Sequence, residues 1–92
     1  MIIRILNENQ YVVPSLFYDD INKIDNRIVS DIAKNDQTAF RKDFAELIAT
    51  IKKNGTPLDV KTLKESDLII PPSDLTFEEA KKIFVGQGLI PD

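Results

Sequence analysis

The chain has 92 residues, the size of one small domain, and its net charge of −3 is spread over both halves without a basic lobe. It contains neither cysteine nor histidine, which excludes disulfides, zinc–thiolate sites and Ser-His-Asp or Cys-His mechanisms within these residues. No apolar run approaches the length of a membrane-spanning helix, so we expect any membrane association to be peripheral or through a partner.

The first residues predict an antiparallel β-hairpin. Residues 2–6 are β-branched and apolar around Arg4, and residues 11–13 form a second such run that Pro14 stops. Between them, Asn7-Glu8-Asn9 is typical of a turn, because asparagine tolerates left-handed backbone. Two strands alone are marginal in water, so the hairpin must pack on helices or pair with a third strand.

Two helices are predicted next. The first begins at an N-cap, Ser15, and ends near Ala33; the second begins at an N-cap, Asp36, and ends at a left-handed stop, Asn54-Gly55. Only about two residues, Lys34-Asn35, connect them. Such a short connection makes the helices antiparallel, as a helical hairpin.

Both helices carry an apolar stripe at helical spacing, and the stripes are expected to face each other. The charged residues of the first helix, including Asp25 and Asp31, are expected on its solvated side. The stripes consist of Phe17, Ile21, Ile24, Ile28 and Ile32 in the first helix and Phe40, Phe44, Leu47, Ile48 and Ile51 in the second.

The remainder of the chain predicts a short strand and a third helix. Residues 67–70 are typical of a strand that Pro71-Pro72 ends, and we expect this strand beside the hairpin. The pattern Thr76-Phe77-Glu78-Glu79 is a capping box, so the third helix begins there, and Gly86 ends it. Residues 59–64 are expected to form a single helical turn. The buried stripe of the third helix is Phe77, Ala80 and Phe84, with Leu75 as the staple residue.

These elements predict a single domain of the α+β class over residues 1–92. It has three helices, an antiparallel helical hairpin plus a C-terminal helix. They pack with a small N-terminal antiparallel hairpin or three-stranded sheet.

Two acidic pairs have the composition of catalytic or metal-binding groups. Asp19-Asp20 beside Asn22 offers oxygen ligands for a divalent cation, but adjacent helical residues point about 100° apart, which favours a solvated helix face. Glu78-Glu79 has the composition of an acid/base pair, but both residues lie in the first turn of a capped helix, where capping explains them. We therefore predict no catalytic, metal-binding or cofactor-binding residues, and no enzymatic activity.

Glycine and lysine motifs also have simple explanations. Gly86-Gln87-Gly88 follows a helix instead of preceding one, so it is predicted to end that helix and not to bind phosphate. The doublets Lys52-Lys53 and Lys81-Lys82 have no interleaved aromatic residues for base stacking, so they are interpreted as solvated helix ends.

Apolar residues outside the helix stripes are the candidate partner contacts. An exposed strand edge or aliphatic patch is a common way for a small domain to recruit a partner. The alternative, equally compatible with the sequence, is that these side chains cap the core between sheet and helices. The candidates are Leu68, Ile69, Ile70, Pro71, Pro72, Leu89, Ile90 and Pro91.

Short motifs in order along the whole chain resemble the PspAA family of small PspA-associated domains. Asn7 and Asn9 depart from the family pattern, which has glycines in this turn, but asparagine can adopt the same backbone. The matching motifs are residues 1–6, Glu8, Gln10-Tyr11, Phe40-Arg41, residues 55–58, residues 66–72 with Asp74, Glu78-Glu79 and residues 88–91.

The resemblance implies a small, mainly three-helical protein encoded near PspA in archaea and actinobacteria. PspA is a coiled-coil protein of the phage-shock, or envelope-stress, response and is related to the membrane-remodelling ESCRT-III group. The family is described as a partner or regulator of PspA, and it implies no catalytic residues.

Our hypothesis is therefore a non-enzymatic protein-interaction module. It would be the partner or regulator of a PspA-like protein in the cytoplasm, near the inner face of the membrane through that partner, and homodimerisation through the hairpin edge is also allowed. The alternative is a small helical nucleic-acid-binding transcriptional regulator, because three short helices can form a helix-turn-helix. The charge count does not favour that alternative, and a metal-dependent enzyme ranks last.

Overall fold

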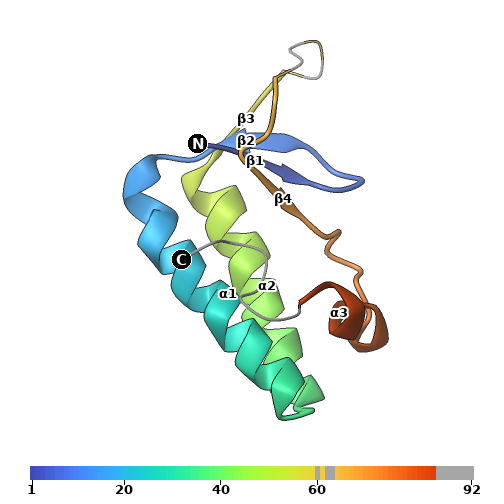
Figure 1. Ribbon diagram of the computed structural model, residues 1–92. Coiled ribbons are helices and arrows are strands. Elements are labelled where there is room, and N and C mark those ends of the chain that lie inside the picture. Colours follow the sequence, from blue (N-terminus) through green and yellow to red (C-terminus); the bar gives the residue numbers. More distant parts are fainter. Residues whose placement is uncertain (60, 62–63, 85–92) are drawn as a thin grey trace.

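A computed structural model describes residues 1–59, 61 and 64–84 of the chain. Its three α-helices, α1 (Tyr18–Ala33), α2 (Gln37–Asn54) and α3 (Phe77–Ile83), combine with a mixed sheet, which confirms the predicted α+β class. The long α1 and α2 form the predicted antiparallel hairpin. Figure 1 shows the sheet at one end of this hairpin and α3 along its flank.

The sheet has four strands among the described residues, one more than predicted. The strands are β1 (Ile2–Ile5), β2 (Gln10–Val12), β3 (Thr56–Pro57) and β4 (Leu68–Ile70), in the order β3-β2-β1-β4. β1 pairs antiparallel with β2 through a turn in which Asn7 has a left-handed φ of 63°. The predicted third strand, β4, lies parallel to β1. The sequence analysis missed β3 because this strand has only two residues, one of them proline.

Residues 64–67, which lead into β4, pass over the outer face of the sheet, where β3 and β4 lie at opposite edges. Gln10 anchors this crossing. It is opposite Arg4 in the ladder, yet only 5% exposed, and its side-chain nitrogen donates to the Lys64 carbonyl and the Ser66 hydroxyl, each at 2.8 Å. The helical turn predicted for residues 59–64 falls partly outside the described residues; Asp59 Oδ1 accepts from the Lys61 N–H at 3.0 Å.

The start of α1 differs from the prediction that Ser15 is an N-cap. Ser15–Phe17 form a 3-10 turn, η1, which Pro14 begins and in which no side chain caps the helix. The Phe17 N–H bonds instead to the Pro14 carbonyl at 3.1 Å. The prediction for α2 is confirmed, since Asp36 Oδ1 accepts from the Ala39 N–H at 3.1 Å.

Gly55, which follows α2, corrects the predicted left-handed stop. Its φ of −99° and ψ of 155° are extended, so conformational freedom is not the reason for a glycine here. Space is the reason. A Cβ at this position would lie 2.6 Å from the Ile51 carbonyl oxygen and 3.0 Å from side-chain carbons of Tyr11 and Val13.

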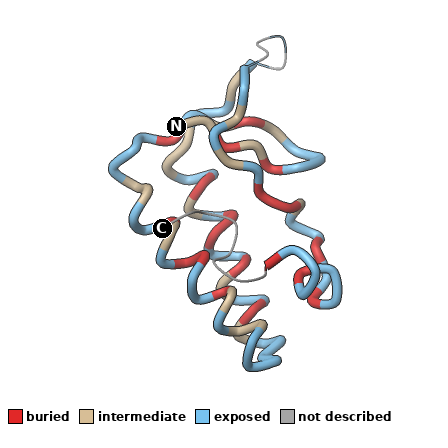
Figure 2. Tube along the Cα trace, viewed as in Figure 1, coloured by how far each residue is buried: buried red, intermediate tan, exposed pale blue. Residues whose placement is uncertain are grey.

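The core lies between the inner face of the sheet and the three helices, and Figure 2 shows buried positions on the facing sides. Both predicted stripes are confirmed in outline, although Phe17 and Ile32 at the ends of the first are only partly buried. Asp25, expected in water, is fully buried beside Ile24 and one turn from Ile21 and Ile28, so the buried arc of α1 is wider than the predicted stripe. The buried apolar residues are Ile3, Ile5, Val13, Ile21, Ile24, Ile28, Phe40, Phe44, Leu47, Ile48, Ile51, Ile70, Leu75, Phe77, Ala80 and Phe84.

Helix α3 attaches to this core through aromatic contacts. The ring centroids of Phe40 and Phe77 are 5.5 Å apart, and those of Phe44 and Phe84 are 6.3 Å apart, both edge-on. The predicted capping box is confirmed, with the Thr76 hydroxyl accepting from the Glu79 N–H at 3.1 Å and the Glu79 carboxylate accepting from the Thr76 N–H at 3.1 Å. The helix end predicted at Gly86 lies outside the described residues.

Candidate interaction surface

The predicted contact stretch, residues 68–72, contributes mostly to the core. Ile70 and Pro71 are buried, and Leu68 is half-buried against the core. Pro72 is also half-buried, which leaves Ile69, at 55% exposure, as the one exposed residue of the stretch. The other predicted contacts, Leu89, Ile90 and Pro91, lie outside the described residues.

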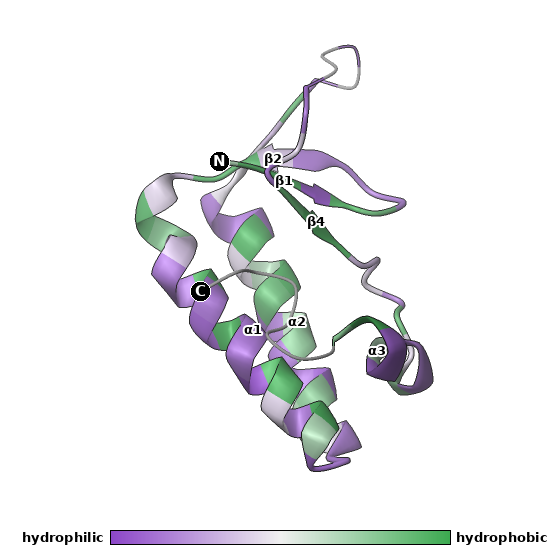
Figure 3. Ribbon diagram, viewed as in Figure 1, coloured by the Kyte–Doolittle hydropathy of each residue, from purple (hydrophilic) through white to green (hydrophobic). Residues whose placement is uncertain are grey.

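Ile69 is one of three exposed aliphatic side chains in and beside the sheet. It is opposite Arg4 in the β1–β4 ladder, and Leu6 and Val12 are also exposed, at 42% and 39%. Figure 3 shows β4 as a strongly hydrophobic strand at the sheet edge. An edge strand with an exposed aliphatic residue has the chemistry of a docking element.

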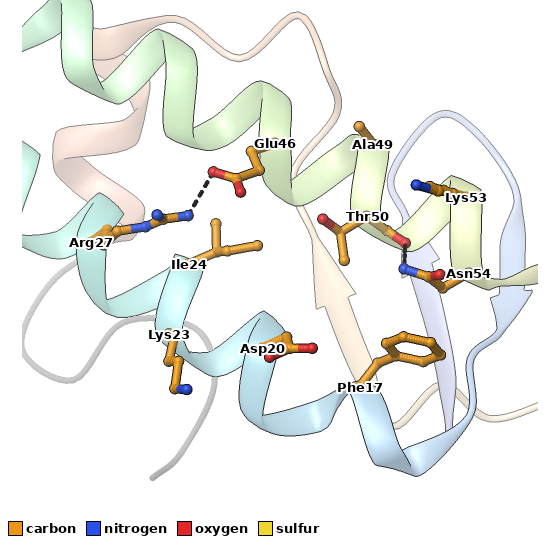
Figure 4. Close-up of a pocket in the computed structure, with 10 residues that line it drawn as sticks. All are labelled: Phe17, Asp20, Lys23, Ile24, Arg27, Glu46, Ala49, Thr50, Lys53 and Asn54. Carbon is orange, nitrogen blue, oxygen red and sulfur yellow. Dashed lines mark hydrogen bonds and ion pairs between the residues drawn. The ribbon is translucent and has the colours of Figure 1, made fainter.

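A first groove of about 700 Å³ runs between α1 and α2, and Figure 4 shows the residues that line it. Phe17 and Ile24 provide apolar surface, but most of the lining is polar or charged. Arg27 spans the two helices: its Nη2 donates to Glu46 Oε2 at 2.6 Å, and its Nε lies 3.8 Å from Asp43 Oδ1. Arg27 and Glu46 therefore offset each other's charge in this groove, whereas its other charged lining residues, Asp20, Lys23 and Lys53, form no ion pair with the described residues.

A second groove of about 420 Å³ lies between α2 and the connection from β4 to α3. Phe44, Ala45, Ile48 and Ala49 make most of its lining apolar. Its remaining lining residues are Arg41, Lys52 and Ser73. This groove thus combines an apolar interior with cationic ends.

Two polar links hold the β4–α3 connection against α2. Glu8, in the β1–β2 turn, accepts from Lys52 Nζ at 2.6 Å and from the Ser73 hydroxyl at 2.8 Å. Hydrogen bonding to Lys52 and Ser73 lowers the pKa of Glu8, and the bond to Glu8 raises the pKa of Lys52. At the other end, Arg41 Nη1 donates to the Leu75 carbonyl at 3.1 Å. The sequence analysis did not predict these links, because their partners are far apart in the chain.

Asp31 and Asp43 form a second electrostatic feature, near the loop that joins α1 to α2. Burial of the Asp31 carboxyl raises its pKa to about 6, and a hydrogen bond with Asp43 and the charges of Asp43 and Asp36 add to this effect. Two carboxyl groups in contact cannot both ionise freely, so Asp31 retains a proton well above its ordinary pKa.

A comparison with protein families shows which family the chain belongs to. A family model described as PspA-Associated protein, PspAA, matches residues 1–92, the whole chain. This chain belongs to the PspAA family. No curated protein and no solved structure matches the chain. The resemblance predicted from the sequence motifs is therefore confirmed.

The PspAA chain places the two acidic pairs on helix surfaces. Asp19 and Asp20 are exposed in the first turn of α1, while Glu79 is part of the capping box and Glu78 lies 3.4 Å from Lys81 Nζ. Among the described residues, no group of three or more acidic, histidine or cysteine side chains could hold a metal ion. Within the same part of the chain, no helix combines the length and apolar character that crossing a membrane requires.

Proposed function

We propose that this PspAA protein is a non-enzymatic interaction module that binds and regulates a PspA-like protein. The observation that carries the proposal is the family match over the whole chain, since the family is described as associated with PspA. In this proposal the protein acts in the cytoplasm and reaches the membrane only through its partner.

The accessible surface supports a binding role. Leu6, Val12 and Ile69 are exposed in and beside the sheet, and the second groove presents apolar lining beside α2. Exposed apolar area with a polar surround is the usual composition of a protein-binding surface.

Direct titration tests the proposal. The folded full chain is titrated calorimetrically with the PspA-like protein encoded by the same organism, and an unrelated coiled-coil protein serves as the control. We expect saturable binding to the PspA-like protein alone. Absence of binding by the folded chain would contradict the proposal, and binding of duplex DNA in its place would support the nucleic-acid alternative.

The predicted contact residues can be tested with a matched pair. Ile69→Asp should leave folding intact, because Ile69 is 55% exposed, and should weaken partner binding about tenfold if the outer sheet face is a contact. Ile70→Asp places a charge in the core, so it should unfold the chain and reports on stability only. Calorimetric affinity and circular dichroism separate the two effects. Unchanged affinity of Ile69→Asp would remove Ile69 from the contact surface.

A further inference from the structure

The exposed side of α2 has cations at both ends and alanines between them. Two cations lie about one turn before the first alanine, and two lie about one turn after the second. All six residues are exposed, and together they extend about 18 Å along the helix at 1.5 Å per residue. We call them the α2 face: Arg41, Lys42, Ala45, Ala49, Lys52 and Lys53.

The acidic residues of α2 adjoin this face on its α1 side. Asp43 and Glu46 point toward α1, where both engage Arg27. Of the four cations, Lys52 is paired with Glu8, while the other three form no ion pair with the described residues. The α2 face is therefore locally positive on a chain whose net charge is −3.

Helix stability explains only half of these charges. Lys52 and Lys53 are in the last turn of α2, where the helix dipole favours cations. Arg41 and Lys42 are in the N-terminal half, beyond the first turn, where the dipole gives a cation no advantage. Arg41 has a structural role through its bond to the Leu75 carbonyl, so the place of Lys42 on the same side as the two alanines is the part that calls for another explanation.

We propose that the α2 face docks an acidic amphipathic helix of the partner protein. The small side chains of Ala45 and Ala49 allow a second helix to approach α2 closely, and this approach is the geometry of tight helix packing. The adjoining groove, lined by Phe44 and Ile48, would receive its apolar side chains. The carboxylates of the partner helix would face the cations at either end of the α2 face. The inference rests on the proposed function, because the partner supplies the helix.

Two other anionic ligands fit the α2 face less well. Binding to an anionic membrane surface generally needs large apolar side chains that insert, whereas the centre of this face is alanine. Binding to a nucleic-acid strand generally uses aromatic stacking, and the face has no aromatic residue that is exposed. An acidic helix that packs closely on Ala45 and Ala49 matches both the positive charge and the flat alanine centre of the α2 face.

Charge reversal tests the inference. The full chain and two variants, Lys42→Glu/Lys53→Glu and Ala49→Glu, are titrated with the PspA-like protein of the same organism, with folding checked by circular dichroism. The matched control, Lys23→Glu/Lys34→Glu, makes the same change in net charge at exposed positions of α1 and its C-cap. We expect at least tenfold weaker binding for both α2 variants, less than twofold for the control, and a shallower salt dependence for Lys42→Glu/Lys53→Glu.

Each other outcome has a definite meaning. If all variants bind as the unchanged chain does, the α2 face is not the docking site, although the proposed function stands. If the unchanged chain does not bind, the proposed function fails and this inference fails with it. If vesicles containing phosphatidylglycerol bind the unchanged chain but not Lys42→Glu/Lys53→Glu, while partner affinity is equal, the face recognises a membrane surface and the helix proposal is wrong.

Discussion

Gly55 illustrates how a single residue can be needed for space and not for backbone freedom. The chain passes from α2 into β3 directly against β2, and a methyl group there would overlap the Ile51 carbonyl oxygen at 2.6 Å. The left-handed stop predicted from Asn54-Gly55 assumed the commoner use of glycine after a helix. The contact with Tyr11 and Val13 depends on tertiary structure, so no local pattern could reveal it.

Substitution of Gly55 separates the two explanations. Gly55→Ala should lower the free energy of unfolding by roughly 1–3 kcal/mol, because the backbone must shift to relieve overlap. Gly55→Asn should be at least as destabilising, whereas a left-handed stop would favour asparagine over alanine. Urea unfolding followed by circular dichroism measures both, with Lys53→Ala on the exposed side of α2 as the control. A Gly55→Asn variant more stable than Gly55→Ala would contradict the close-approach explanation.

Asp31 makes stability depend on pH. Its pKa rises from 3.8 to about 6 in the folded chain, so between these values the folded state binds the proton more tightly than the unfolded state. The stabilisation from this proton is complete below pH 3.8 and is lost as the pH rises through about 6. At neutral pH the ionised Asp31 beside Asp43 is a net cost to folding.

Asp31→Asn should therefore stabilise the chain at pH 7.5 by roughly 1 kcal/mol, somewhat less than the energy of one pKa unit. The amide is neutral at all pH values and can donate to the Asp43 carboxylate. Thermal unfolding at pH 4 and pH 7.5 measures the effect, and the gain should disappear at pH 4. Asp74→Asn removes the same charge at an exposed position, and an equal pH-dependent gain there would show that Asp31 has no special role.

At the scale of elements, local signals predicted the three helices and strands β1, β2 and β4, but not the 3-10 start of α1 or strand β3. Asp36 and Thr76 were predicted as caps because their partners are three residues away. β3 pairs with β2 across both long helices in the sequence, and Gln10 bonds to Lys64 and Ser66, which are more than 50 residues away. A buried glutamine beside a turn has no distinguishing local pattern, so the sequence predicts only a single helical turn at residues 59–64 and not the contacts with Gln10.

The crossing gives a prediction for this element. Gln10→Ala removes both side-chain hydrogen bonds and leaves the Lys64 carbonyl and Ser66 hydroxyl without this donor, so it should cost roughly 1–3 kcal/mol of folding free energy. Limited trypsin digestion should then cut faster after Lys64. Ser66→Ala, which leaves the Lys64 contact in place, should have the smaller effect on both measurements. Digestion of Gln10→Ala at the unchanged rate would show that Gln10 does not hold the crossing.

For the whole molecule, the fold class and the family followed from the sequence, whereas the binding surface did not. The α+β class, the helical hairpin and PspAA membership are all confirmed. The apolar run at residues 68–72 suggested a surface patch, but a parallel strand beside β1 directs Ile70 into the core and leaves Ile69 outside. Strand alternation alone indicates two sides without identifying which one faces the helices.

The α2 face could not be recognised from the sequence for a similar reason. Lys52-Lys53 alone is adequately explained by the helix end. Its relation to Arg41 and Lys42 appears only once the α1 side of α2 is known and Asp43 and Glu46 are seen to pair with Arg27. The groove beside it forms between α2 and Ser73, which lies beyond β4.

Zero-length cross-linking of the full chain with its PspA-like protein tests whether the α2 face contacts an acidic helix of that protein. A carbodiimide joins a lysine amine to a carboxylate only when the two are in contact, and mass spectrometry identifies the joined residues. We expect Lys42 or Lys53 to be joined to an aspartate or glutamate of a helix in the PspA-like protein. Cross-links from Lys23 or Lys34 alone would contradict docking at the α2 face. The absence of any cross-link between the two proteins at saturating concentration would contradict their association.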